Sequence, residues 1–303
     1  MKCAAIDFGT NTARLLIGER INRKLSTLRV EREIVRLGGG FSDDMGLSEE
    51  AQKRGLNCLK KFAGIIREYG VEQIRASATS AVRDAVNGAT FVEHVFRETG
   101  IRLNVIGGDL EGRLTLEGVI SGLDVIHEKM VVLDVGGGST ELTVAENGIP
   151  QFVRSIPLGV VRLTEGFTTF QSMNQRIVTV LNQLETEMSA AGICGQPGSE
   201  LVATAGTATT LAAIQMEMTD YDYRRVNNFL ISRAEIEAIY QRLLPLSPSE
   251  RISIPGLEKG REDLIMAGIL ITEQVMDRFG FGRLKVSDYG LLEGLAISDI
   301  ELV

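Results

Sequence analysis

Two short segments of the chain have the composition of phosphate-binding turns. Residues 7–12 read DFGTNT and residues 134–140 read DVGGGST. In each segment an acidic residue ends an apolar run, and small, mostly polar residues follow. Glycine lets a backbone approach an anion closely, and the hydroxyl groups add hydrogen-bond donors. The sequence therefore predicts two strand–turn–strand units that hold phosphate, with a pair of ordinary tight hairpins as the alternative.

A third turn of small residues, Ala205 to Thr207, follows an apolar strand pattern at 201–204 and opens a helix pattern. Anions bind well at a helix N-terminus, where backbone N–H groups point outward. The candidate phosphate contacts from the three turns are Gly9, Thr10, Asn11, Gly136, Gly137, Gly138, Ser139, Thr140, Gly206 and Thr207.

Three acidic residues are candidate metal ligands: Asp7, Asp134 and Glu141. Hard cations such as Mg²⁺ or Mn²⁺ prefer oxygen ligands, and a phosphate substrate supplies part of the coordination shell. A single strand-end Asp more often caps its own turn, but two copies in one chain favour the metal interpretation. Glu141 is less defined, because strand alternation could place it on either face.

Strand and helix patterns alternate, which predicts an α/β fold. In the first part we expect a helix from Ser48, as N-cap, to a stop at Gly70. The further elements expected there are a strand at 74–78, a short helix near 81, a helix at 89–98 stopping at residue 100, and a strand at 101–106. Asp109 is the expected N-cap of the next helix, which places Glu111 and Arg113 in its first turn.

The second part repeats the opening theme of strand, turn and strand, which indicates a structural duplication. Glu146-Asn147-Gly148 predicts a tight hairpin, and Ser232 with Glu235 predicts a capping box. Further elements are expected at 258–279 (helix), 284–286 (strand) and 290–297 (helix). With a boundary near Gly122, the predicted domains are 1–122 and 123–303, and the last helix could pack on the first domain.

Composition and charge limit the classes of function that the protein can have. The net charge is −8, and residues 1–122 carry 18 Lys and Arg against 16 Asp and Glu, so the acidic excess lies in the second part. General nucleic-acid binding is therefore disfavoured. The chain shows neither a membrane-spanning run nor a signal-peptide pattern, which predicts a cytoplasmic protein without membrane contact. Cys3, Cys58 and Cys194 lack the spacing of a zinc site or disulfide framework.

These motifs, in this order, resemble the actin, Hsp70 and sugar-kinase superfamily. Two more segments narrow the resemblance: ATSAVRDA at 78–85 and GDLEGR at 108–113. Together with PGL at 255–257, RED at 261–263 and SDYGLLEG at 287–294, they resemble the exopolyphosphatase and guanosine pentaphosphate phosphohydrolase family. The resemblance implies two actin-like, ribonuclease H-like lobes with an active-site cleft between them, and Mg²⁺-dependent release of a terminal phosphate.

By this resemblance Glu111 matches the family's catalytic glutamate, which positions or deprotonates water. Without the family match, a carboxylate that favours a helix N-terminus would be the preferred interpretation. The family often has a second acidic residue just before it, where this chain has Leu110. Arg83 and Arg113 are candidates for bidentate phosphate binding, although Arg113 could equally pair with a carboxylate on its own helix.

Three functions remain open at this stage. The first is a Mg²⁺-dependent exopolyphosphatase and the second is a pppGpp 5′-phosphohydrolase. The third is an ATP-dependent kinase or a non-catalytic sensor that binds guanosine tetra- or pentaphosphate. Since long family members carry an extra helical domain and this sequence stops at Val303, we expect short polyphosphate or pppGpp to be handled better than long chains. A homodimer is expected by resemblance only.

Overall fold

The structure is a computed structural model that describes residues 2–21, 24–42, 44–193 and 198–302. Strands and helices alternate along the chain, which confirms the predicted α/β class. The chain divides into two compact units. The first unit comprises Met1–Gly118 and Leu291–Val303, and the second comprises Val119–Gly290.

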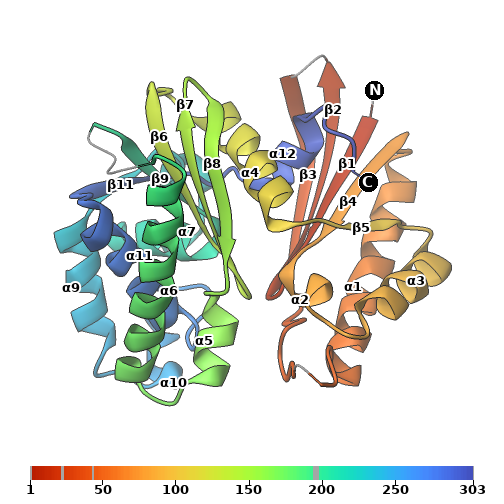
Figure 1. The fold of residues 1–303 in the computed structure, drawn as a ribbon. Coiled ribbons are helices and arrows are strands. Elements are labelled where there is room, and N and C mark those ends of the chain that lie inside the picture. Colours follow the sequence, from red (N-terminus) through yellow and green to blue (C-terminus); the bar gives the residue numbers. More distant parts are fainter. Residues whose placement is uncertain (1, 22–23, 43, 194–197, 303) are drawn as a thin grey trace. The chain divides into compact units, whose positions relative to one another are not determined.

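A five-stranded mixed sheet forms the centre of the first unit (Figure 1). Its order is β3-β2-β1-β4-β5. The strands are β1 (Lys2–Phe8), β2 (Thr12–Ile21), β3 (Lys24–Ile34), β4 (Gln73–Ala78) and β5 (Leu103–Val105). Because β1, β4 and β5 run parallel, their carboxyl ends meet at one edge of the sheet.

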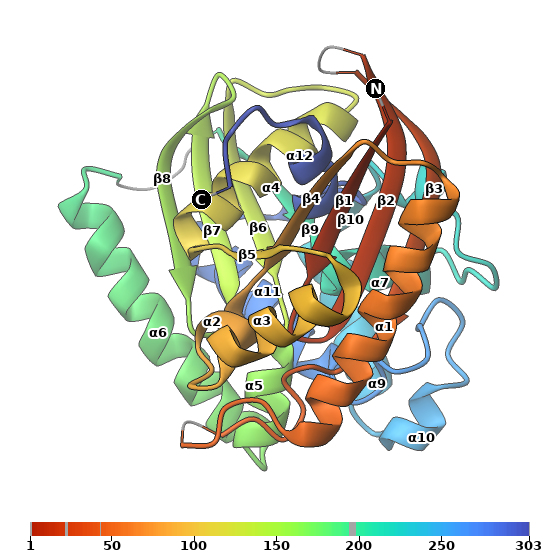
Figure 2. The same ribbon diagram turned by 90° about the vertical axis from the view of Figure 1, so that its right-hand side faces the viewer.

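Helices cover both faces of this sheet (Figures 1 and 2). The helices of the unit are α1 (Glu49–Glu68), α2 (Ser80–Arg83), α3 (Gly88–Thr99), α4 (Gly108–Gly122) and α12 (Leu291–Ile297). Side chains alternate along a strand, so Ile6 and Phe8 pack in the core under α1 and α3, whereas Ala5 packs with α12. Helix α4 starts in the first unit, and its last residues belong to the second.

The second unit is built around a six-stranded sheet of order β10-β11-β9-β6-β7-β8. Its strands are β6 (Lys129–Val135), β7 (Thr140–Glu146), β8 (Ile149–Ile156), β9 (Glu200–Thr204), β10 (Leu230–Ser232) and β11 (Arg283–Val286). Strands β6, β9 and β11 are parallel, so the segments that follow them start from the same edge.

One large core holds the sheet and helices of this unit together, with Leu133, Leu211 and Ile269 fully buried in it. The helices are α5 (Val160–Gly166), α6 (Phe170–Ala190), α7 (Ala205–Gln215), α8 (Tyr223–Val226), α9 (Arg233–Leu243), α10 (Pro248–Arg251) and α11 (Ile265–Phe279). Alternation along β6 points Leu133 and Val135 into this core and Asp134 to the opposite face.

Several predicted local signals are confirmed. The Ser48 side chain caps α1 by accepting from Ala51 N–H at 3.3 Å, and Gly100 ends α3 in the left-handed conformation. Asn147 and Gly148 both have positive φ angles between paired strands β7 and β8, as a two-residue hairpin requires. The capping box of Ser232 and Glu235 is present at α9.

Three expectations about element ends are wrong. Helix α4 starts at Gly108, so Asp109 lies inside its first turn and is not the N-cap. The helix expected at 258–279 starts only at Ile265, because turns occupy the preceding residues. Strand β5 is shorter than the expected 101–106, since the flanking residues leave the ladder.

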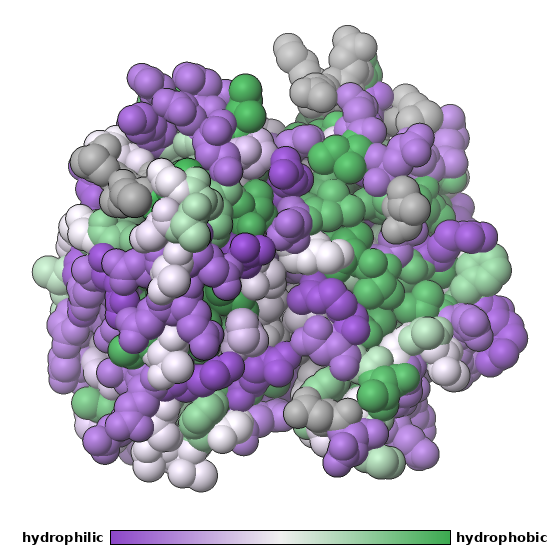
Figure 3. All heavy atoms as spheres, viewed as in Figure 1, coloured by the Kyte–Doolittle hydropathy of each residue, from purple (hydrophilic) through white to green (hydrophobic). Residues whose placement is uncertain are grey.

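Two further features are the hydropathy of the surface and the state of the cysteines. In the face shown by Figure 3 the second unit is largely hydrophilic, whereas more hydrophobic surface lies over the first unit. No helix among the described residues is long and apolar enough to cross a membrane. Cys3 and Cys58 are buried free thiols, and burial raises the pKa of Cys58 to about 12, whereas Cys194 lies outside the described residues.

Candidate functional site

The first predicted turn is a hairpin between β1 and β2. Four residues, Gly9 to Thr12, separate the last paired residue of β1 from Ala13 on β2, and the Gly9 N–H donates to the Thr12 carbonyl at 3.0 Å. In this register Asp7 lies directly opposite Arg14. The Arg14 guanidinium donates to Asp7 Oδ2 from Nε at 3.2 Å and from Nη2 at 3.0 Å.

The second turn repeats this geometry. Four residues, Gly136 to Ser139, separate Val135 from Thr140, and the Gly136 N–H donates to the Ser139 carbonyl at 3.0 Å. Here Asp134 lies directly opposite Glu141. The duplication seen in the sequence is thus a duplication of hairpin register, in which Glu141 takes the place that Arg14 has in the first hairpin.

Glu141 is held on its strand by two hydroxyl groups. Its Oε1 accepts from Ser139 Oγ at 2.8 Å and from Ser155 Oγ at 2.6 Å. Glu141 is only 2% exposed and Asp134 9%. The second hairpin therefore places two buried carboxylates next to each other, whereas the first pairs one carboxylate with a cation.

The middle of each turn keeps donors for an anion. Within the described chain, no backbone carbonyl accepts the N–H of Thr10, Asn11, Gly137 or Gly138. The Asn11 side chain is 6% exposed, and neither its Nδ2 nor its Oδ1 has a partner among the described residues. Since buried polar atoms are normally satisfied, this amide is a candidate contact for a bound ligand.

Glu111 and Arg83 lie near the first turn, at the carboxyl edge of the five-stranded sheet. The Phe8 carbonyl accepts from Thr79 N–H at 3.4 Å, and the Ala78 carbonyl accepts from Ile106 N–H at 3.0 Å. These bonds connect the ends of β1, β4 and β5, so α2 and α4 both start at this edge. The Thr10 and Ser80 hydroxyls, 2.9 Å apart, join the turn to α2.

The Glu111 carboxylate is buried, with 7% of the residue exposed. Arg83 Nη1 lies 3.3 Å from Glu111 Oε2 and also donates to the Ile106 carbonyl at 3.1 Å. Arg83 Nε lies 3.5 Å from Asp84 Oδ1. The Arg83 guanidinium thus lies beside two carboxylates at this edge of the sheet.

Arg113 lies apart from this group. It is exposed on the second turn of α4, and the described residues give it neither an ion pair nor a hydrogen bond. The pairing with a carboxylate on its own helix is therefore not formed. Its role as a phosphate ligand stays a prediction.

The third turn opens α7 and is closed in by other residues of the second unit. A Cβ atom on Gly206 would lie 1.9 Å from Arg261 Nη1, so the glycine admits the guanidinium to the turn. Arg261 is 9% exposed, and its Nε donates to Glu258 Oε2 at 2.8 Å. On the other side, the Thr207 side chain packs against Gly268 of α11.

The backbone of this turn is strained. Ala205 has a φ of +63°, in the left-handed region where a residue with a Cβ is disfavoured. Such strain persists only where the surrounding structure holds it, and it concentrates at functional positions. The Thr204 hydroxyl, just before the turn, donates to the Tyr289 carbonyl at 2.9 Å and ties β9 to the loop after β11.

The second hairpin turn packs against the start of α5 and is hydrogen-bonded to it. A Cβ atom on Gly159 would lie 2.3 Å from the Gly137 carbonyl oxygen, so only glycine allows this approach. The N–H groups of Val160 and Val161 donate to the Gly136 and Gly137 carbonyls at 3.0 and 2.9 Å. The Thr140 hydroxyl donates to the Leu158 carbonyl at 2.6 Å, so it supports the turn from behind.

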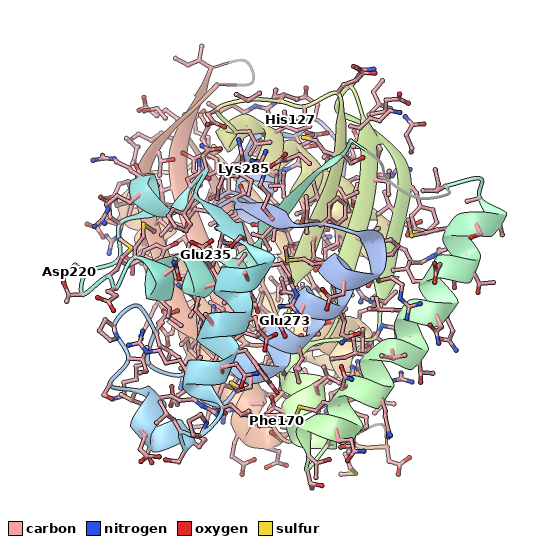
Figure 4. The ribbon with its side chains drawn as sticks, turned by 90° about the vertical axis from the view of Figure 1, so that its left-hand side faces the viewer. His127, Phe170, Asp220, Glu235, Glu273 and Lys285 are labelled. Atoms are coloured by element: carbon pink, nitrogen blue, oxygen red, sulfur yellow. The ribbon has the colours of Figure 1, made fainter. Side chains whose placement is uncertain are left out.

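A charged cluster surrounds Glu273, which is labelled on α11 in Figure 4. Arg233 on α9 contacts three carboxylates: Glu273 at 2.8 Å, Asp277 at 2.9 Å and Glu237 at 3.1 Å. Of the three carboxylates only Glu273 is buried, whereas the side chains of Glu237 and Asp277 are 42% and 52% exposed. Burial first, with the neighbouring acids adding to it, raises the pKa of Glu273 to about 7.

Arg14, Ser80, Ser155 and Arg261 contact candidate site residues but are missing from the sequence-based list. Arg14 could have been found by counting across the turn, because a four-residue connection places it opposite Asp7. Arg261 belongs to a segment that the resemblance includes, but nothing in the sequence shows that it meets Gly206. Among the described residues no group of three or more His, Cys, Asp and Glu side chains forms a metal cage.

Comparison with known sequences gives the family. Residues 16–302 match the model of the Ppx/GppA phosphatase family. The chain is 32% identical to exopolyphosphatase 2 of Mycobacterium tuberculosis, over 98% of both chains. It is 28% identical, over 98% of its length, to the guanosine-5'-triphosphate,3'-diphosphate pyrophosphatase of Aliivibrio fischeri, of which it covers 59%.

Two further matches concern length and structure. The chain is 32% identical to the bifunctional 3-dehydroquinate synthase/phosphatase of Fusobacterium nucleatum, and it spans only 46% of that protein. The solved structure of the Aquifex aeolicus PPX-GPPA enzyme matches with a TM-score of 0.81 and 32% identity, over 99% of each chain. With matching sequence, fold and motif order, the chain belongs to the Ppx/GppA phosphatase family.

Proposed function

We propose that the protein is a phosphoanhydride hydrolase that releases the terminal phosphate of inorganic polyphosphate. Water attacks the terminal phosphorus, the bond to the bridging oxygen breaks, and orthophosphate and a chain shorter by one phosphate are the products. The observation that carries this proposal is the buried Glu111 carboxylate beside Arg83, at the edge where the first phosphate turn lies.

Glu111 acts as the general base in this proposal. It takes a proton from the attacking water, a role that needs an ionised carboxylate within hydrogen-bond reach. Arg83 positions the Glu111 carboxylate and offers its remaining N–H groups to phosphate oxygens. With Leu110 as the preceding residue, a single carboxylate performs this step.

The turns hold the phosphates. The N–H groups of Thr10, Asn11, Gly137 and Gly138, which donate to no backbone carbonyl of the described residues, are donors of the kind that bind phosphate oxygens. The unpartnered Asn11 amide supplies a side-chain donor to the same ligand. Gly206, Thr207 and the Arg261 guanidinium offer a third contact in the second unit.

The second hairpin suits a divalent cation. Asp134 and Glu141 give two hard oxygen donors on one face of adjacent strands, and Mg²⁺ is commonly bound by one or two carboxylates together with substrate phosphates and water. When bound, Mg²⁺ or Mn²⁺ would neutralise charge on the transferred phosphate. Asp7 is a weaker candidate because Arg14 already contacts its carboxylate.

The test compares wild-type protein with Glu111→Gln, which keeps the shape of the side chain but removes the base. Phosphate release from polyphosphate should fall at least about a hundredfold, since a general base contributes on the order of 10²–10⁴ in rate. Polyphosphate binding should persist. Turnover close to wild type would reject Glu111 as the base, and no release by the wild-type protein would reject the proposed activity.

A second candidate function is hydrolysis of the 5′-terminal phosphate of pppGpp to give ppGpp. The similarity to the Aliivibrio fischeri pyrophosphatase, which spans nearly the whole chain, favours it. Side-by-side assays with polyphosphate and pppGpp separate the two, and tight ppGpp binding without turnover would indicate a sensor. A cytoplasmic location and a homodimer stay predictions, the latter to be tested by light scattering.

A further inference from the structure

An exposed aromatic and basic segment lies between α7 and β10. Tyr221 and Tyr223 are 50% and 44% exposed. The chain has only 5 tyrosines among its 303 residues, so two exposed tyrosines in one short segment are unusual for it. The Arg224 guanidinium lies 5.5 Å from the centre of the Tyr223 ring, and its Nε donates to the Tyr223 hydroxyl at 3.3 Å. Arg225 is exposed beside them. We call Tyr221, Tyr223, Arg224 and Arg225 the tyrosine platform.

The platform is anchored rather than loose. The Asp222 carboxylate caps α8 by accepting from the Arg224 N–H at 3.0 Å. Val226 is fully buried in the core of the second unit. The Asn228 N–H donates to the Val286 carbonyl at 2.8 Å, which fixes the segment to the end of β11. A fixed surface loses little conformational entropy when a ligand binds.

A short series of contacts connects the platform with the third phosphate turn. The Tyr221 hydroxyl donates to Asp288, and the Asp288 N–H donates to Asn227 Oδ1 at 3.0 Å. The next residue, Tyr289, accepts from the Thr204 hydroxyl at 2.9 Å, directly before the turn. Since consecutive Cα atoms are about 3.8 Å apart, the Tyr221 hydroxyl lies within about 15 Å of Thr204. A nucleoside triphosphate can span that separation.

The chemistry of the platform fits a purine base rather than a phosphate chain. Exposed tyrosine rings and a planar guanidinium stack on bases, and every base offers a π-face for this. Bare polyphosphate has no group that uses an aromatic ring. Asp220, which projects outward beside the platform (Figure 4), adds a carboxylate acceptor. Guanine presents N–H donors on its Watson–Crick edge, which a carboxylate can accept.

We propose that the tyrosine platform binds the guanine base of a nucleotide whose 5′ phosphates reach the turn at Ala205 to Thr207. This inference rests on the proposed hydrolase function and specifies the second substrate class, guanosine nucleotides with a 5′ polyphosphate. The platform then decides between the substrates, because it contributes to binding of pppGpp and not to binding of inorganic polyphosphate.

The experiment measures KM for pppGpp and for inorganic tripolyphosphate in Tyr221→Ala and Tyr223→Ala. Loss of a stacking partner should raise KM for pppGpp about tenfold or more, because base stacking on an aromatic ring is worth roughly 1–3 kcal/mol. KM for tripolyphosphate should change less than about twofold. Tyr223→Phe keeps the ring and should restore pppGpp binding.

A matched control is Phe96→Ala. Phe96 is 47% exposed on α3 and has the Arg102 guanidinium 5.2 Å from its ring centre, so it is a similar surface pair without a phosphate turn in its contacts. Its removal should leave both KM values unchanged. Calorimetric titration of ppGpp into the same variants gives a readout independent of turnover.

The outcomes separate the two proposals. Unchanged ppGpp and pppGpp binding in Tyr221→Ala and Tyr223→Ala, with normal tripolyphosphate hydrolysis, overturns the platform and leaves the proposed function intact. Equal losses on both substrates show a structural role and also overturn it. Failure of the wild-type protein to bind ppGpp overturns the platform, and failure to hydrolyse any of the substrates overturns the proposed function.

Discussion

Asp134 and Glu141 lie directly opposite each other on β6 and β7, and both are buried. The equivalent pair in the first hairpin is Asp7 and Arg14, which form an ion pair at 3.0 Å. Like charges directly opposite each other destabilise a sheet. The two hairpins thus share a register but differ in charge, and we expect a cation to bind at the second and not at the first.

The first prediction concerns Glu141→Gln. Removing one of the two carboxylates should weaken cation binding, so the Mg²⁺ concentration for half-maximal phosphate release should rise about tenfold, the lower end of the cost of disturbing a metal site. Titration of activity with Mg²⁺ measures it. Glu146→Gln, an exposed position on the same strand, is the control. Equal Mg²⁺ dependence in both variants would place the cation elsewhere.

Gly206→Ala tests the third turn. The new Cβ would take the place of the Arg261 guanidinium, which must then move from its bond with Glu258. We expect phosphate release to fall at least about tenfold, since small displacements of binding groups cost up to about a hundredfold. Gly64→Ala on α1 is the control, because nothing lies within 4 Å of its added Cβ. It should stabilise the protein by about 0.5–1 kcal/mol.

Wild-type activity in Gly206→Ala would show that Arg261 does not contribute to the site. Unfolding transitions of both variants, followed by circular dichroism, show whether the fold is retained. An activity loss without a lower Tm assigns the effect to the turn itself.

The sequence predicted the parts of the fold that local chemistry decides. Helix α1 begins at its Ser48 cap, and the Asn147-Gly148 hairpin has the positive φ angles that its residues favour. Neither β3 nor α6 was predicted, although Thr169 caps α6 and apolar positions such as Met173, Ile177 and Val180 repeat at helical spacing. The charged and exposed β3 at the sheet edge gave a weaker signal.

Candidate site residues that lie within one short segment could be predicted from the sequence. Contacts between residues from distant segments could not. The two hairpins follow from local motifs, whereas Glu111 was identified by the resemblance to the family. The contact of Arg261 with Gly206, and that of Ser155 with Glu141, depend on packing and strand register that join residues far apart in the chain. Sequence patterns carry no direct record of such contacts without homologues to compare.

A third prediction concerns the pH dependence of stability. The pKa of Glu273 is raised by burial from 4.5 to about 7. Because the folded state holds this proton more tightly than the unfolded chain, the contribution to stability is complete below pH 4.5 and is lost as pH rises through 7. The loss is about 3 kcal/mol, at 1.36 kcal/mol per pKa unit.

Glu273→Gln removes this titration. Urea unfolding between pH 4.5 and 8 should then show a flatter stability profile than wild type, whereas the exposed Glu93→Gln should keep the wild-type slope. If wild type and Glu273→Gln lose stability in parallel over this range, another group carries the dependence.

The last prediction uses Arg83→Ala to test the coupling between Arg83 and Glu111. Without the guanidinium at 3.3 Å, the Glu111 carboxylate loses a contact that positions it, and the substrate loses a phosphate ligand of the proposed site. The maximal rate of phosphate release should therefore fall at least about tenfold, since a small displacement of a catalytic group costs up to about a hundredfold. Arg97→Ala, at an exposed arginine of α3, is the control and should keep the wild-type rate. Wild-type kinetics in Arg83→Ala would place Arg83 outside the site, and an equal loss in Arg97→Ala would show that the effect is not specific to the contact with Glu111.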